Sequence, residues 1–411
     1  KWTAITIISI LLFITIIYSI ILYNSEYIKN YAFSQFTQNF SVKIGVKNIK
    51  INLLSNFPNI TIKLEDIYIQ NKLYPFNGNR NLLTANEISL TFNIIDIIRK
   101  NYKIKTIIVK NSNLNIYFTK NGNNIDIIKS GQTTHNLNIK LNNIVFKKTK
   151  LHIVNSIKNQ SFIFEIKNLN LAGYFANKNY DLDINTNLKI KKVFLNNDTI
   201  LSDVPVDGSF KIIVNDNQYN INRTNLYIDD ILFKINGFIN SYNNYIDLKI
   251  NSNNFELSNL LNKISNNQII KNYNVTGIFS FNGYIKGFIT NNSYPKIYIY
   301  SSLTNGSLNN TEQQISLKIN NLVSYFQNYG IKNNFIEFNI TKFNVSINEN
   351  TIDGYASLII KENDKNIKFK ILSNNVNLAD LNKFLKNKYE FNITPQNGSA
   401  KFQLSFNGNF K

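Results

Sequence analysis

The sequence predicts a mainly β protein, with one N-terminal transmembrane helix followed by a long, repetitive antiparallel sheet. Three observations support this class. Residues 2–23 contain no charged side chain, most later segments alternate apolar and polar residues, and a segment near residue 252 recurs near residue 373. Alternation of this kind gives each strand one apolar and one polar face, as in antiparallel sheets.

Composition bounds the function without identifying it. The 411 residues carry 45 Lys and Arg against 25 Asp and Glu, a net charge of +20, with no Cys and no Met. The lack of Cys excludes a disulfide scaffold. Ile, Asn, Lys, Phe and Tyr are all abundant together, so biased base composition explains part of the basicity. With no Met and a pattern that stops at Lys411, we interpret the sequence as a fragment that continues further.

The first region, residues 1–25, is predicted to be the membrane anchor. Its uncharged stretch of about 22 residues forms roughly 33 Å of helix, enough to cross a bilayer core of about 30 Å. Trp2 at one end and Tyr18 and Tyr23 at the other fit interfacial positions. A cleaved signal peptide is the competing interpretation, but no small-residue cleavage site follows the stretch.

A short helix is expected after the anchor. Four apolar residues recur at every fourth position and would share one side of it: Ile28, Ala32, Phe36 and Phe40. That side either lies at the membrane surface or packs on the fold behind it, and packing is the favoured use.

Strands dominate after Ser41, and Asn-Gly or Asp-Gly pairs are expected to form the hairpin turns. These pairs are Asn121-Gly122, Asp207-Gly208, Asn236-Gly237, Asn282-Gly283, Asp353-Gly354 and Asn397-Gly398. Helices are expected only at residues 94–100, 257–264 and 378–386.

An internal repeat indicates a repetitive sheet over residues 131–411. The segment Ser252–Leu260 matches Ser373–Leu381, which lies 121 residues later, and flanking segments extend the two copies to about 235–287 and 352–411. Each copy reads as strands, a short helix and strands again.

Residues 26–130 resemble the N-terminal region of the AsmA family of inner-membrane-anchored periplasmic proteins. The resemblance lies in a strand-proline-strand segment, a segment before a short loop, two strands and a closing glycine-asparagine turn. These segments are Ile51–Ile67, Leu82–Leu90, Tyr102–Val109, Leu114–Phe118 and Asn121–Asn124. The repeat resembles the C-terminal part of the family more loosely.

The resemblance implies a curved sheet whose concave face forms an apolar groove, related to that of bridge-like lipid transfer proteins. It further implies a single-pass protein of the bacterial inner membrane, with most of the chain in the periplasm, that supports outer-membrane assembly by holding or transferring phospholipids. Envelope assembly proteins are the other expected partners. Alternation predicts the groove-lining residues as Ile139, Leu141, Phe164, Ile166, Leu248, Ile250, Ile315, Leu317, Phe369 and Ile371.

An anchored scaffold without bound lipid is the alternative, because a closed sandwich needs the same alternation. No catalytic, cofactor or metal motif occurs, so we expect neither an enzyme nor a cofactor. His135 and His152 have no carboxylate or Cys at ligand spacing. The clusters Lys147–Lys150 and Lys189–Lys192 could bind phosphate headgroups, although a solvated face is the simpler interpretation and nucleic acid is not expected.

Overall fold

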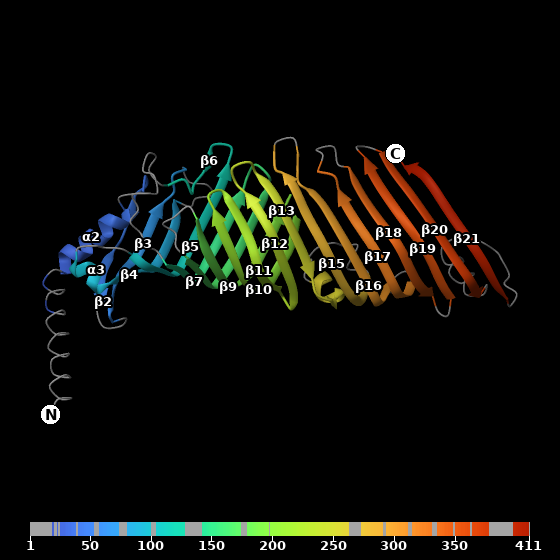
Figure 1. The fold of residues 1–411 in the computed structure, drawn as a ribbon, viewed down its shortest axis with the longest axis horizontal. Coiled ribbons are helices and arrows are strands. Elements are labelled where there is room, and N and C mark those ends of the chain that lie inside the picture. The colour runs from blue at the N-terminus through green and yellow to red at the C-terminus, as the bar shows by residue number, and fades with distance from the viewer. Residues whose placement is uncertain are drawn as a thin grey trace, which may run out of the picture. The chain divides into compact units, whose positions relative to one another are not determined.

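A computed structural model confirms a mainly β protein in which neighbouring strands follow one another along the chain (Figure 1). The structure describes residues 19, 23, 25–37, 40–52, 57–73, 80–99, 104–127, 142–173, 179–196, 198–262, 273–290, 293–310, 315–330, 335–347, 350–361, 364–377 and 398–410. The chain divides into two units, Lys1–Val214 and Asn215–Lys411, which we call unit 1 and unit 2.

Unit 1 combines two helices with long strands. Its elements are α2 (Ser25–Thr37), β1 (Ile44–Gly45), β2 (Asn48–Asn52), β3 (Asn59–Gln70), β4 (Asn81–Asn93), α3 (Ile94–Ile98), β5 (Ile104–Thr119), β6 (Gly122–Asn123), β7 (Asn143–Asn155), β8 (Gln160–Gly173), β9 (Asn179–Leu195) and β10 (Asp198–Asn215). Antiparallel ladders join β3 to β1, β2 and β4, then β4 to β5, β7 to β8 and β8 to β9.

One pair of neighbours departs from the expected antiparallel order, because β5 and β7 are parallel. The register runs from Thr106 opposite Asn143 to Phe118 opposite Asn155. A parallel neighbour requires the chain to return to the same end of the sheet before the next strand starts. The turn at Asn121-Gly122 only folds the two residues of β6 back onto β5, and the return that follows has no sequence signal.

Unit 2 contains eleven strands and one short helix among its described residues. They are β11 (Gln218–Ile228), β12 (Ile231–Asn240), β13 (Tyr245–Ser252), β14 (Phe255–Glu256), α4 (Leu257–Leu261), β15 (Asn274–Phe288), β16 (Lys296–Asn310), β17 (Ile315–Asn328), β18 (Ile336–Ile347), β19 (Asn350–Lys361), β20 (Asp364–Asn377) and β21 (Ser399–Phe410). Every ladder between the described strands of this unit is antiparallel.

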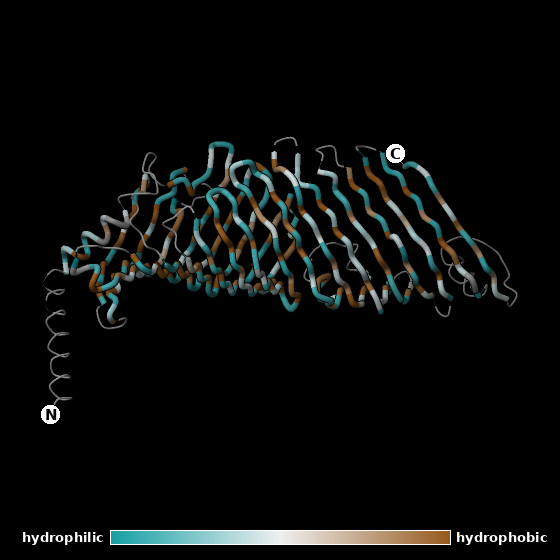
Figure 2. Tube along the Cα trace, in the orientation of Figure 1, coloured by the Kyte–Doolittle hydropathy of each residue, from teal (hydrophilic) through white to brown (hydrophobic). Residues whose placement is uncertain are grey.

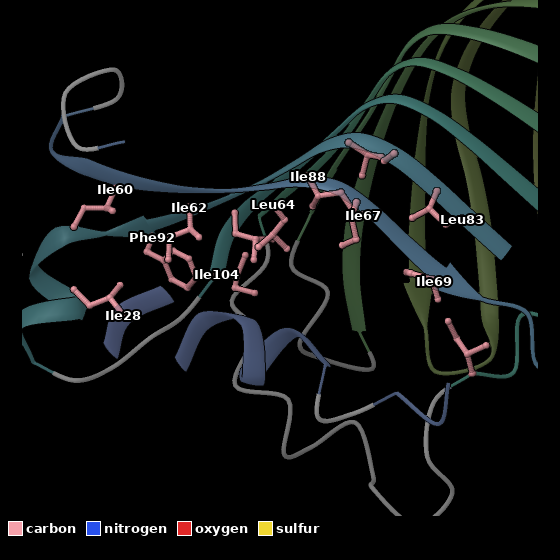
Figure 3. Packing of buried hydrophobic residues seen from close by; sticks show 14 of the residues in the cluster. Ile28, Ile60, Ile62, Leu64, Ile67, Ile69, Leu83, Ile88, Phe92 and Ile104 are labelled. Atoms are coloured by element: carbon pink, nitrogen blue, oxygen red, sulfur yellow. The ribbon is translucent and has the colours of Figure 1, made fainter. Parts of the chain in front are cut away.

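The core of unit 1 forms where α2 covers β3 and β4. Ile28 of α2 and Leu64 of β3 are buried in the same cluster (Figure 3). Leu90 of β4 also belongs to this cluster. The predicted packing of this helix is therefore confirmed for Ile28, and Phe40 also packs against the cluster. Phe33, which the four-residue pattern omits, adds to the contact, while the side chains of Ala32 and Phe36 lie outside the described part of the structure.

A line of bulges crosses unit 1 at one level of the sheet. Asp66 in β3, Asn111 in β5 and Lys148 in β7 have φ of 50°, 48° and 52°, and each is missing from the register of its strand. In β3, β4, β5, β7 and β8 the ladders skip one residue at this level, so the apolar period shifts by one without turning these strands over. The next strand, β9, has no such residue, and its ladder with β8 shifts register there. Bulges bend the strand that carries them, and Figure 3 shows these strands bending over the core.

Most Asn-Gly and Asp-Gly pairs are not turns, so that prediction was wrong. The pairs at Gly208, Gly237, Gly283 and Gly354 lie inside β10, β12, β15 and β19. Gly237 has φ of 132°, and a Cβ there would lie 2.0 Å from the carbonyl oxygen of Asp247. Close approach of two backbones, and not a turn, selects this glycine.

The turns instead use single Asn and Asp residues in the left-handed region. Asn159, Asn196, Asp216, Asp229 and Asn244 have φ between 49° and 56° and lie between consecutive strands. Asn and Asp tolerate this conformation because their side chains bond to nearby backbone groups. Asn397 lies outside the described residues.

The repeat is reproduced in strand register. Lys249 pairs with Tyr284 and Phe255 pairs with Phe279 in one copy. The residues 121 positions later pair in the same way, Lys370 with Ser405 and Val376 with Ala400. The predicted helices at 94–100 and 257–264 are present as α3 and α4, and the one at 378–386 lies outside the described residues.

The predicted membrane anchor lies almost wholly outside the part of the chain that the structure describes. Trp2 and Tyr18 fall there, while Tyr23 is 91% exposed. Among the described residues, no helix is both long and apolar enough to cross a bilayer.

Candidate functional site

The strand registers define two chemically distinct faces in each unit. Residues directly opposite each other in neighbouring strands share a face, and successive residues alternate between faces. Figure 2 shows the resulting alternation of apolar and polar residues along single strands. We call the two sides the apolar face and the polar face of each unit.

The apolar face of unit 1 continues from the helix-covered core across β5, β7, β8 and β9. One row of paired residues on this face is Leu83, Leu114, Leu151, Phe164 and Ile190. Phe164 and Ile166, both predicted to line the groove, lie on this face. Ile139 and Leu141 lie outside the described residues.

The apolar face of unit 2 holds the other described groove candidates. Tracing the pairs from strand to strand places five of them on one face: Leu248, Ile250, Leu317, Phe369 and Ile371. Ile315 starts β17, and its side chain lies outside the description. The described candidates of each unit therefore share one face of that unit's sheet.

The two apolar faces differ in how much protein covers them. In unit 1, Leu64 and Leu90 are 0% exposed beneath α2. In unit 2, the larger contacts between described elements join neighbouring strands or bring α4 onto β14 and β15. Phe338, Phe406 and Leu404 on this face are consequently 40%, 40% and 52% exposed.

One candidate of unit 2 is part of a small protein core. Ile250 packs against the buried residues Ile231, Phe233 and Phe255, together with Leu260 of α4. Phe369 and Ile371, farther along the sheet, are only partly buried. The open part of the apolar face therefore lies around β18 to β21.

A buried hydroxyl pair interrupts the apolar face of unit 1 at the bulge line, a feature that sequence reasoning missed. Ser112 Oγ and Thr149 Oγ1 are 2.7 Å apart, and the two residues are 2% and 1% exposed. A buried hydroxyl needs a partner, and each of these supplies the other's. The sequence does contain a signal for this pair. Ser112 and Thr149 lie three residues after the apolar residues Val109 and Phe146, whereas strict alternation predicts an apolar residue two positions after each of them.

Charged and hydrogen-bonding groups stabilise the polar faces. In unit 1, the Glu87 carboxylate lies 2.7 Å from Lys110 Nζ and 3.6 Å from Lys63 Nζ. Burial alone would raise the pKa of Glu87, but hydrogen bonds from Lys110 and Ser89 outweigh it and lower this pKa. These charges are neighbours across strands, an arrangement that stabilises the sheet.

In unit 2, tyrosine side chains form the contacts that stabilise the polar face. Tyr325 and Tyr329 donate hydrogen bonds of 2.8 and 2.9 Å to the two carboxylate oxygens of Glu337. Burial and the bond to Glu337 raise the pKa of Tyr325 to about 12. Lys249 lies over the ring of Tyr284, 5.5 Å from its centre, on the same polar face.

The histidines form no metal centre in the described residues, where no three His, Asp or Glu side chains are grouped suitably. His152 Nε2 lies 3.0 Å from Ser161 Oγ, and burial lowers the pKa of His152. His135 lies outside the described residues.

The fold and the faces together define a repetitive β-sheet protein in which each unit has one apolar and one polar face. Comparison with known proteins adds no family to this description, because no family model, no curated protein and no solved structure matches the chain.

Proposed function

We propose that this chain is a membrane-anchored periplasmic protein that holds or transfers phospholipids along its apolar face and so supports outer-membrane assembly. The observation that carries the proposal is the partly exposed apolar face of unit 2, with Leu404 at 52% exposure. The resemblance of residues 26–130 to the AsmA family agrees with it. In this proposal the protein is not an enzyme, and its location is the bacterial inner membrane with the sheet in the periplasm.

The free energy of apolar burial favours a lipid as the molecule that covers the apolar face. A continuous exposed apolar surface is a liability for a protein in water unless something covers it. Acyl chains gain about 0.8 kcal/mol for each CH₂ that they bury. A row of residues such as Phe338, Leu358 and Ile367 crosses successive strands and offers contacts along the length of such a chain.

The proposal also limits where lipid can bind. Under α2, the side chains of Leu64 and Leu90 are fully buried by protein, so no acyl chain fits there. On β7, β8 and β9 the apolar residues Leu151, Phe164 and Ile190 are only partly buried. Lipid is therefore assigned to β7–β9 in unit 1 and to β18–β21 in unit 2.

The buried core under α2 is the observation that favours the alternative function, an anchored scaffold for envelope assembly. A scaffold needs a stable sheet and a partner for its apolar face, but no lipid. The two functions differ in what contacts the partly exposed face of unit 2 in the cell.

Photo-crosslinking in living cells tests the proposal. A photoreactive amino acid placed at Phe338 or Phe369 should capture phospholipid, whereas the adjacent positions Asn339 and Lys370, on the polar face, should not. Mass spectrometry of the extracted protein would identify the attached lipid. If the Phe338 and Phe369 positions capture protein and never lipid, the scaffold function replaces the lipid-binding one.

A further inference from the structure

The polar face of unit 1 contains a hollow of about 440 Å³ between β7, β8, β9 and β10. It is lined by Lys148, Thr149, Lys150, Glu165, Ile166, Lys167, Asn187, Leu188, Lys189, Pro205 and Asp207. Lys150, Glu165 and Lys189 form one cross-strand row on the polar face, so the hollow opens on that side of the sheet. Thr149, Ile166 and Leu188, a row of the apolar face, also contribute to its lining. The fold thus brings together the two lysine clusters that are about 40 residues apart in the sequence.

The charge of this hollow is positive and only partly compensated. Its lining includes four lysines and two acidic residues. Glu165 lies directly between Lys150 and Lys189 across the strands, and Asp207 accepts a hydrogen bond from the side-chain amide of Asn187. Both acids therefore already have polar neighbours on the sheet.

The positive charge of Lys189 is also compensated by an acidic residue outside the hollow. Its Nζ lies 3.0 Å from Asp203 Oδ1, and Lys191 Nζ lies 2.6 Å from the same oxygen. Lys148, Lys150 and Lys167 make no ion pair with any residue in the described part of the chain. Lys150 has the acidic Glu165 opposite it in the ladder, whereas Lys148 and Lys167 are left out of the ladder between β7 and β8 and have no acidic partner there. These two ammonium groups are therefore the least compensated positive charges of the hollow.

The backbone at the hollow is a second, independent feature. The ladder between β7 and β8 omits the pair of Lys148 and Lys167, and the ladder between β8 and β9 shifts register between Ile166 and Asn168. A bulged residue is left out of the ladder, and Lys148 also has φ of 52°. Successive backbone N–H groups near a left-handed residue form concavities that bind anions.

From these features we infer that the hollow binds a phosphate group, held by the ammonium groups of Lys148 and Lys167 beside the interrupted ladder. The site is separate from the proposed lipid-binding face because it opens on the opposite side of the sheet. Inorganic phosphate and the phosphodiester of a phospholipid headgroup both present this chemistry. An acyl chain on the apolar face cannot place its own headgroup there.

Calorimetric titration of the detergent-extracted full chain tests the inference. Two probes distinguish the source of the phosphate: inorganic phosphate, and dihexanoyl phosphatidylglycerol below its micelle-forming concentration. The double variant Lys148→Gln/Lys167→Gln removes two charge-assisted contacts and should weaken binding of the preferred probe about tenfold or more. Glutamine removes the charge, remains polar and is one heavy atom shorter than lysine, and it suits the backbone of position 148 no less than lysine does.

The control removes the same charge elsewhere in unit 1. Lys105 and Lys158 are exposed and do not line the hollow, so Lys105→Gln/Lys158→Gln should leave affinity within about twofold at fixed salt. Glu165→Gln removes a negative charge from the lining and should tighten binding, an effect that a purely structural role would not produce. Failure of both probes to bind, or equal losses in the two double variants, would overturn the inference.

Discussion

A glutamate at position 404 should remove lipid from unit 2 while leaving the sheet folded. Leu404 lies on the apolar face, is 52% exposed and pairs with Ile371 of β20. Complete burial of a leucine side chain stabilises a protein by about 1.5–3 kcal/mol, so a half-exposed one contributes about 1 kcal/mol. Leu404→Glu should therefore lower the unfolding temperature by only about 2–4 °C, because water can still reach the carboxylate.

The same carboxylate would oppose an acyl chain on this face, so phospholipid recovered with the protein should fall strongly. The assay combines thermal unfolding with mass-spectrometric counting of lipid per protein after mild detergent extraction. Ser405→Glu is the matched control, because Ser405 is the next residue of β21 and faces Lys370 on the polar side. It should change neither measurement.

A third variant, Leu64→Glu, measures the effect of placing a charge in a closed core. Leu64 is 0% exposed in the core under α2, so Leu64→Glu would bury a charge without a partner and should unfold unit 1. If Leu404→Glu is as destabilising as Leu64→Glu, the face around β21 is a closed core. If Leu404→Glu is stable and retains its lipid, lipid binds elsewhere.

Two further predictions follow from the backbone and from the charges. Gly237→Ala should destabilise unit 2 by about 2 kcal/mol or more in chemical denaturation, because the new Cβ would lie 2.0 Å from a carbonyl oxygen at a φ of 132°. Gly122→Ala, with a positive φ but open space, should cost less. The lowered pKa of Glu87 stabilises the fold fully above its ordinary value of 4.5 and loses this effect as the pH falls through the lowered pKa. Acid unfolding of Glu87→Gln should consequently depend less on pH below 4.5, and an unchanged profile would contradict the assignment.

The sequence was sufficient for the chemistry of the faces and insufficient for the path of the chain. Alternation placed Phe369 and Ile371 on the apolar face because a strand has a strict period of two. The prediction of turns was wrong for most of these pairs because Asn-Gly is favourable both in hairpin turns and where two backbones approach closely. Only the structure distinguishes the two cases. The parallel pairing of β5 and β7 depends on a long connection without a local signal.

In the sequence, the bulges are visible only as interruptions of the two-residue alternation of apolar and polar side chains. Leu64 and Ile67 are both buried although they are three residues apart, and Phe146 and Thr149 share a face at the same spacing. In the sequence of a single strand, each interruption resembles the end of that strand. Its recurrence at one level in neighbouring strands becomes visible only when the register is known.

The bulge line also explains why the proposed lipid face and the proposed phosphate site of unit 1 lie back to back. An extra residue at the same level in β5, β7 and β8 keeps the registers of these strands aligned on both sides of the bulges. Bulges bend the strands that carry them, and the ladder pair missing between Lys148 and Lys167 lies at the hollow on the polar face. Phe146 and Thr149 stay on one face although three residues separate them, because the inserted Lys148 is left out of the ladder. The same inserted residue provides a lysine for the lining of the hollow.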